Sequence, residues 1–385
     1  MIYLDNNATT RPSDASVRAM VDALTDHWHN PSSIHRAGQA ARQAIELARK
    51  AVADLINARP RDIVFTSGGT ESINMAIRGT LAASPRRAIV TSPIEHEAVR
   101  GLCEQMRDLH GFELRLAPMT RGGVVDVAKT CKLIDETVAI VSVMWANNET
   151  GAVQPVEAIG ARCREVRAVF HCDGTQWVGK MPTDVQKSPV DLLTFSSHKF
   201  HGPKGAGGLY IRPGVRIRPI THGNQEMLRR GGTENVPGAI GMGVAAAECA
   251  AWLQDPANRR AVSDLRDHFE RSILERCPES CVNAPEDADQ RLWNTSNIAF
   301  PRLEAEALLL MLSEKGVCAS AGSACSSGSL EPSPVLCAMG IPADAAHGSL
   351  RFSLSRETTR EEVDRAVEII SGAVEKMRGM MPARA

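Results

Sequence analysis

Short apolar runs alternate with longer amphipathic segments over roughly the first two thirds of the chain. The apolar runs are rich in Val, Ile, Leu and Phe, and six of them occupy residues 61–67, 87–92, 137–145, 168–174, 190–197 and 207–213. Helical patterns lie between several of them, at residues 68–83, 95–109 and 156–166. Strands that alternate with helices indicate a mostly parallel sheet covered by helices on both faces. We therefore expect an α/β domain from about residue 14 to about residue 255.

The pattern changes after the polar stretch at residues 253–260. A long helix is expected from Ser263 to Arg276, followed by a strand at 295–301 and a helix at 304–316. This succession is typical of a smaller α+β domain. A chain of 385 residues is also too long for one small core, so two domains are the natural expectation.

Composition excludes several classes of function. Lys and Arg number 44 against 45 Asp and Glu, so no global charge favours nucleic acid or a membrane surface. The N-terminus has no basic segment followed by an apolar one, and the apolar stretch 237–253 is short, rich in alanine and interrupted by Glu248. We expect a cytoplasmic protein without a membrane span.

The ten cysteines are scattered, which favours reduced thiols over a disulfide framework. Cys277 and Cys281 form the only close pair, a weak metal signal without nearby histidines. Cys325 is different, because it lies in the run "AGSACSSGSLEPSPV" among small residues that restrict the backbone little. The run alone predicts a loop of about 321–333 with an exposed thiol, and a reactive or an inert thiol fits equally well.

Polar groups follow the ends of several predicted strands, where open parallel sheets bind ligands. Gly68-Gly69 frees the backbone before Thr70 opens a helix, and a helix N-terminus attracts phosphate. By itself this is also an ordinary turn with a helix cap. Asp173 lies at the end of the apolar run at 168–174, and Gln176 lies just beyond it. Such an acid is a cap, a metal ligand or the partner of a protonated ring nitrogen, as pyridoxal phosphate requires.

Lys199 follows the strand at 190–197 and precedes a loop rich in glycine and proline. It is either a solvated loop residue or a desolvated amine held for Schiff-base chemistry. Ser196 and His198 beside it could reach the same phosphate. A phosphate cradle, an acid and a lysine in this order predict a pyridoxal phosphate site more strongly than any one of them does.

Nine short motifs resemble, in order, the signatures of the cysteine desulfurases, a group of class V aminotransferases within the fold-type I pyridoxal phosphate enzymes. They are "YLDNNATT", "NPSSIHRAG", "FTSGGTES", "EHEAV", "WANNETG", "SSHKFHGPKG", "RRGGTENVPG", "SAGSACSSGSLEPS" and "GSLRFSLSR". The NifS branch is the most similar. The resemblance implies a seven-stranded, mostly parallel sheet in a large domain (14–255), and a small domain made of 1–13 and 256–385.

The resemblance also implies roles for single residues around the cofactor. Lys199 matches the Schiff-base lysine, Asp173 the acid on the pyridine nitrogen, and Gln176 the residue near the phenolic oxygen. His96 matches the imidazole that stacks on the ring, although a histidine there is more often a helix-start residue. The phosphate-binding positions match Gly69, Thr70, Ser196, His198 and, across a dimer interface, Thr233.

Asn148 and Arg351 match groups near the substrate carboxylate. Asn148 also matches a cofactor-binding position. Arg351 would hold the carboxylate bidentately, as a planar guanidinium does, whereas an ordinary surface ion pair is the default without the family.

The implied reaction removes sulfur from L-cysteine. Lys199 takes the Cα proton, Cys325 attacks the substrate sulfur as a thiolate, and alanine leaves while Cys325 keeps a persulfide; His96 moves a proton. A homodimer is implied that passes sulfur to an iron–sulfur scaffold protein, with Cys325 as a transient ligand of the nascent cluster. The NifS features associate this pathway with nitrogenase.

Other interpretations stay open. A plain aminotransferase, or a lyase such as selenocysteine lyase, needs no mobile thiol, and a scaffold that lost its chemistry needs neither Lys199 nor Asp173. Gly174 stands where the family usually has alanine, and Asn224 interrupts a Gly-Gly-Gln-Glu run, so both concern local loop geometry. Cys318 and Cys337 are expected to be core thiols, with extra sulfur relays as the alternative.

Overall fold

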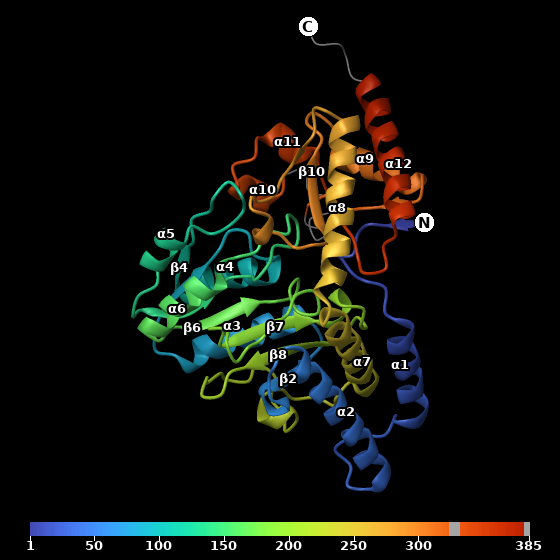
Figure 1. The fold of residues 1–385 in the computed structure, drawn as a ribbon. Coiled ribbons are helices and arrows are strands. Elements are labelled where there is room, and N and C mark those ends of the chain that lie inside the picture. The colour runs from blue at the N-terminus through green and yellow to red at the C-terminus, as the bar shows by residue number, and fades with distance from the viewer. Residues whose placement is uncertain (323–331, 381–385) are drawn as a thin grey trace.

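The computed structural model describes residues 1–322 and 332–380, and its strands and helices alternate through the large N-terminal part (Figure 1). The strands are β1 (Ile2–Tyr3), β2 (Ile63–Thr66), β3 (Ala88–Thr91), β4 (Glu113–Leu116), β5 (Val138–Ser142), β6 (Val169–Asp173), β7 (Leu192–Ser196), β8 (Gly207–Ile211), β9 (Cys281–Val282), β10 (Thr295–Ala299), β11 (Val317–Cys318) and β12 (Ser349–Ser353). The α-helices are α1 (Asp14–Asp26), α2 (Arg36–Leu55), α3 (Gly69–Ala83), α4 (Glu97–His110), α5 (Val127–Lys132), α6 (Val156–Val166), α7 (Val236–Leu253), α8 (Pro256–Arg276), α9 (Ala305–Glu314), α10 (Pro334–Ala338), α11 (Ala343–His347) and α12 (Arg360–Gly379).

Seven strands form the central sheet in the order β2-β8-β7-β6-β5-β3-β4. Strands β7, β6, β5, β3 and β4 run parallel, whereas β8 pairs antiparallel with both β7 and β2. The prediction of a mostly parallel, seven-stranded α/β sheet is confirmed. The apolar pattern itself reveals six of these strands; the edge strand β4 alternates charged and leucine residues and is partly exposed, so it lacks an apolar run.

Helices cover both faces of the sheet. On one face, α3 and α4 pack their apolar sides against β3 and β5. On the other face, α2, α6 and α7 form the largest core together with β6 and β7. The central strands are buried on both sides, which is why β5 reads as the unbroken apolar run Val-Ala-Ile-Val before Ser142.

Helix α7 is long and apolar enough to cross a membrane by length and composition alone. Half of it is buried in the fold, where it packs against α1 and α2 (Figure 1). That packing is typical of a core helix in a globular domain.

The C-terminal part has its own sheet, β12-β10-β9, and its own core. Helices α8, α9 and α12 contribute to that core, and so does Leu4 from the N-terminal segment. Strand β1 pairs in parallel with β11. These contacts support the division that we propose, in which residues 1–13 join residues 256–385 as a small domain beside residues 14–255.

The junction between the two parts differs from the sequence expectation. Helix α8 begins at Pro256, seven residues before Ser263, and the carboxylate of Asp255 caps it by accepting the backbone N–H of Ala257 at 2.9 Å. Proline suits the first turn of a helix because its missing N–H would have no partner there. The polar stretch therefore contains the start of helix α8, which is longer at its N-terminal end than expected.

Candidate active site at the carboxyl ends of the strands

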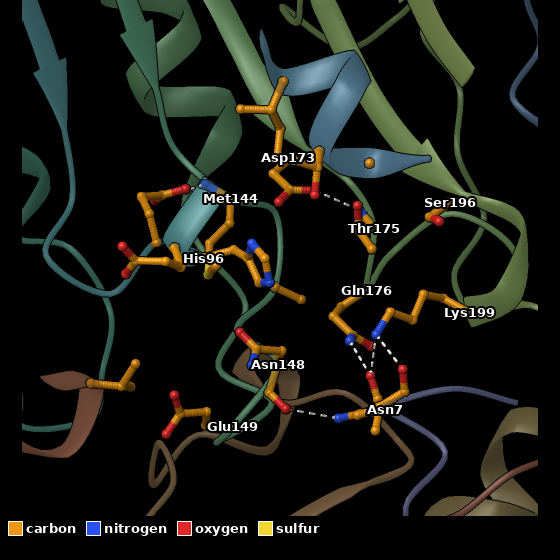
Figure 2. A pocket seen from close by; sticks show the side chains of 18 of the residues that line it. Asn7, His96, Met144, Asn148, Glu149, Asp173, Thr175, Gln176, Ser196 and Lys199 are labelled. Atoms are coloured by element: carbon orange, nitrogen blue, oxygen red, sulfur yellow. Dashed lines mark hydrogen bonds between the residues drawn. The ribbon is translucent and has the colours of Figure 1, made fainter. Parts of the chain in front are cut away.

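A cavity of about 600 Å³ lies where the parallel strands end, and it gathers most of the residues singled out from the sequence. Figure 2 shows several of their side chains around one common space. The predicted residues that line the cavity are Gly69, Thr70, His96, Asn148, Asp173, Gln176, Ser196, His198, Lys199 and Arg351. They come from segments after β2, β3, β5, β6 and β7, and from β12.

One end of the cavity is suited to a phosphate. Helix α3 starts at Gly69, and its N-cap residue Gly68 has no side chain to satisfy the first N–H groups. The hydroxyl of Thr175 is buried there without a hydrogen-bond partner. A Cβ atom on Gly69 would lie 3.2 Å from that hydroxyl oxygen, so glycine keeps the space open. Ser196, at the end of β7, adds a further hydroxyl to the lining.

Asp173 and His96 lie on other sides of the same space (Figure 2). Asp173 ends β6, is buried, and accepts the backbone N–H of Thr175 at 3.0 Å. His96 is the N-cap of α4, and its Nδ1 accepts the N–H of Ala98 at 3.1 Å. A neutral imidazole that accepts at Nδ1 carries its hydrogen on Nε2. His96 is thus both a helix-start residue and part of the cavity wall.

The amine of Lys199 is held by the N-terminal segment. Its Nζ donates to the backbone oxygens of Asn7 at 2.6 Å and Ala8 at 2.8 Å. Burial, aided by the charge of Lys199, lowers the pKa of neighbouring His198 to about 4, so that imidazole is neutral at physiological pH. Its Nδ1 lies 3.2 Å from the hydroxyl of Thr9.

Arg351 is almost fully buried in β12, so it is not the surface ion pair that a lone arginine suggests. One of its terminal nitrogens donates to Asp5 at 2.7 Å and the other to the backbone oxygen of Asn148 at 3.1 Å. Its Nε is buried without a partner. The contact with Asn148 brings together the two residues expected near a substrate carboxylate.

Several other residues contribute to the site and escaped the sequence analysis, Thr175 and Arg100 among them. Asn7 and Glu149 lie inside the quoted motifs "YLDNNATT" and "WANNETG", but nothing in their local pattern distinguishes them from their neighbours. Lys180 looks like a surface lysine until the fold buries it. Glu95 precedes His96, and burial raises the pKa of its carboxyl to about 8.

Two predicted site residues are not among those that line the cavity. Thr233 is exposed and lies away from its own chain's cavity, which is compatible with an action across a dimer interface. Cys325 lies outside the described residues. On one side of its segment, Gly322 lies close to Glu149; on the other, Ser333 donates to the Glu149 carboxylate at 2.5 Å, while Pro334 and Val335 line the cavity.

The remaining cysteines are mostly structural. Cys103, Cys163, Cys172, Cys249 and Cys277 are buried. The expectation that Cys318 and Cys337 are core thiols is wrong for Cys337, which is exposed on the outer side of the short helix α10, and Cys318 is only partly buried. Within residues 1–322 and 332–380, no group of three or more His, Cys, Asp or Glu side chains could hold a metal ion.

The structure explains one of the two departures from the family pattern. A Cβ atom on Gly174 would lie 2.6 Å from Cδ1 of Leu193, so alanine would require Leu193 to move. The departure concerns packing beneath the site, because Gly174 is not a lining residue. Asn224 is exposed, and nothing in the structure explains it.

Comparison with known families decides the relationship. The model of the family described as aminotransferase class-V matches residues 2–366. The chain belongs to this family. The class V relatives include the NifS cysteine desulfurase of Azotobacter vinelandii and the IscS cysteine desulfurase of Methanosarcina thermophila. Each is 44% identical over 99% of this chain, covering 94% of its own length.

A solved structure described as a NifS-like protein superposes on this class V chain with a TM-score of 0.90. It is 35% identical, and the match covers 97% of this chain and 99% of the other. The motif resemblance is confirmed at the level of the family, and the fold-type I architecture with it.

Class V enzymes of this group use pyridoxal phosphate, and the cavity fits that cofactor. The open helix start and the unpartnered Thr175 hydroxyl suit its phosphate. Asp173 suits its ring nitrogen, and Lys199 its aldehyde carbon. When bound, the cofactor supplies an electron sink for the substrate's Cα carbanion.

Proposed function

We propose that this class V enzyme is a cysteine desulfurase, which converts L-cysteine to L-alanine and keeps the sulfur as a persulfide on Cys325. The observation that carries the proposal is the convergence of Lys199, Asp173, His96 and Arg351 on one cavity. Membership of the class V family supports pyridoxal phosphate chemistry, and the relatives named as cysteine desulfurases support L-cysteine as the substrate.

Each residue has a task that its environment supports. Arg351 and Asn148 bind the substrate carboxylate, with Arg351 held in place by Asp5. Lys199 removes the Cα proton, and the backbone oxygens of Asn7 and Ala8 accept hydrogen bonds from its amine when that amine is free. His96, with its hydrogen on Nε2, is arranged to give a proton to a leaving group.

Cys325 takes the sulfur in this proposal. The described residues that flank its segment lie at the cavity: Ser333 bonds to Glu149, and Val335 belongs to the lining. Attack requires a thiolate, and a free thiol is only a few per cent ionised at neutral pH. The guanidinium of Arg100, which is paired with Glu97, also lines the cavity, and its positive charge acts on Glu149 beside that segment.

The finer assignments extend this proposal. We propose a cytoplasmic homodimer in which Thr233 completes the partner's phosphate site, and an iron–sulfur scaffold protein as sulfur acceptor, with Cys325 as a transient cluster ligand. The NifS-like motifs favour a nitrogenase pathway as the destination of the sulfur, and a NifS relative at 44% identity supports that association.

Replacing Lys199 by alanine tests the function. With pyridoxal phosphate bound, the wild-type enzyme should release alanine from L-cysteine, and Lys199→Ala should be slower by a factor of about 10²–10⁴, the usual value of a positioned base. Lys187→Ala is the matched control, because Lys187 is 88% exposed. Alanine release by Lys199→Ala at the wild-type rate would refute the proposal.

A further inference from the structure

Lys180 is a buried lysine for which the proposed reaction gives no task. It is only 4% exposed and makes no ion pair with any carboxylate of residues 1–322 and 332–380. Burial lowers the pKa of its amine well below the usual value, and the charges of Lys199 and Arg351 lower it further. Burial of an amine destabilises the fold because the group loses its contacts with water. A buried amine beside a functional site is therefore a candidate for a role in that site.

Two amide oxygens accept hydrogen bonds from the Lys180 amine. They are Oδ1 of Asn7 at 2.7 Å and Oε1 of Gln176 at 2.6 Å. Both contacts are donated by the amine, so each amide oxygen faces an N–H group of Lys180. Neither amide can turn over without placing its own NH₂ group against a donor.

A third donor confirms the orientation of Asn7. Asn294 Nδ2 also donates to Oδ1 of Asn7, at 3.0 Å. On its other side, Nδ2 of Asn7 donates to Thr295 at 2.9 Å and to the backbone oxygen of Asn148 at 3.1 Å. Hydrogen bonds to both its oxygen and its nitrogen therefore fix the orientation of the Asn7 amide. Its oxygen in turn holds the amine of Lys180 in place.

The consequence falls on Gln176. With Oε1 turned to Lys180, its Nε2 donates to the backbone oxygen of Asn7 at 2.9 Å, the same oxygen that accepts from Lys199 (Figure 2). A primary amide has two N–H groups, so one remains to donate to a ligand in the cavity. A reversed Gln176 would offer that ligand a carbonyl oxygen instead.

We propose that Lys180 is a positioning residue that orients the Gln176 amide, so that an N–H group meets the phenolic oxygen of pyridoxal phosphate. The inference rests on the proposed function, which places that oxygen beside Gln176. A hydrogen bond to the phenolic oxygen draws electron density from it. The oxygen then holds the proton on the adjacent Lys199–cofactor nitrogen less firmly, and this proton is lost at lower pH.

The visible absorption of the loaded enzyme reports that proton loss directly, without turnover. Lys180→Met removes the amine and keeps most of the side-chain volume. The midpoint of the pH titration should then rise by about one pH unit, the equivalent of one hydrogen bond. Gln176→Ala should raise it by a similar amount. The double variant should rise no further than Gln176→Ala alone, because Lys180 acts through Gln176.

Lys187→Met, at an exposed lysine seven residues further along the chain, should keep the wild-type midpoint. If Lys180→Met does not fold, Lys180→Gln replaces it in the test. The shorter glutamine side chain cannot reach both amide oxygens. It should therefore raise the midpoint by less than Lys180→Met, but in the same direction. An unchanged midpoint, or a double variant whose shift equals the sum of the single shifts, overturns the proposal for Lys180. A wild-type enzyme that binds pyridoxal phosphate without a visible band contradicts the proposed function instead.

Discussion

Glu95 is an acid that the fold keeps protonated beside the reacting groups. One carboxyl oxygen accepts the Ser92 hydroxyl at 2.5 Å and the Met144 N–H at 3.0 Å, while the other is buried without a partner. Burial raises the pKa to about 8, and the negative charge of Asp173 adds to the effect. The neutral carboxyl spares the cavity a second negative charge close to Asp173.

This pKa makes stability depend on pH with a definite sign. The folded protein holds a proton that the unfolded chain, with a usual pKa of 4.5, releases at lower pH. The stabilisation is complete below about pH 4.5 and is lost as pH rises through about 8. Between these two pH values, the difference of one bound proton lowers the free energy of unfolding by about 1.4 kcal/mol for each pH unit.

Glu95→Gln should remove this dependence, because glutamine is neutral and similar in shape. The free energy of unfolding is measured in urea at about pH 6 and about pH 8. Between these two pH values the wild type should lose more of it than Glu95→Gln does, by on the order of 1–3 kcal/mol. Glu97→Gln removes an exposed carboxyl two positions further along the chain and should behave like the wild type. Parallel pH profiles for wild type and Glu95→Gln would show that Glu95 is ionised in the fold.

Lys199 and Asp173 could be found in the sequence because each lies at, or just after, the end of a predicted strand. Lys180 and Glu95 could not. Their importance comes from burial and from partners such as Asn7, which is 173 positions away from Lys180. Long-range burial of this kind leaves no local pattern in the sequence. The prediction that Cys337 is a core thiol was wrong for the same reason, because its apolar neighbours do not show which face of α10 is exposed.

The start of helix α10 joins the segment that carries Cys325 to the cavity wall. Ser333 caps the helix by accepting the N–H groups of Val335 and Leu336, and its hydroxyl hydrogen goes to Glu149. Val335 and Leu336 pack against Ile94 and other residues near the strand ends. One side chain thus fixes both a helix end and the rim of the site.

Ser333→Ala should therefore lower stability by about 1 kcal/mol and also slow alanine release. Thr359→Ala is the matched control, since Thr359 caps α12 through a capping box and does not line the cavity. It should cost a similar amount of stability in thermal unfolding while leaving the rate of alanine release unchanged. Equal rates for both variants would contradict the link from Ser333 to the site.

Most elements of the central sheet follow from periodicity, because buried parallel strands read as apolar runs. The exceptions have physical reasons. Strand β4 lies at the edge with Glu113 exposed and Arg115 in ion pairs with Glu113 and Asp135, so it needs little apolar surface. Helix α8 begins in a polar stretch because Asp255 and Pro256 are start signals rather than linker residues.

The whole chain brings together segments that are far apart in the sequence. Asn7 near the N-terminus, the ends of the central strands and Arg351 in β12 enclose one cavity. The small C-terminal core and the large sheet therefore share the site, and the segment of Cys325 begins and ends beside it. Motif order predicted this grouping, while the hydrogen-bond network that holds it became visible only in the fold.

Sulfur transfer to Cys325 is the central claim, and mass spectrometry tests it most directly. The loaded enzyme is incubated with L-cysteine without an acceptor thiol, and alanine is measured together with the mass of the peptide that contains Cys325. We predict one added sulfur on Cys325 for each alanine in the first turnover, an unchanged result for Cys281→Ala, and no added sulfur for Cys325→Ala. Alanine formed with Cys325 unmodified, or sulfur added to exposed Cys337 instead, would contradict the account.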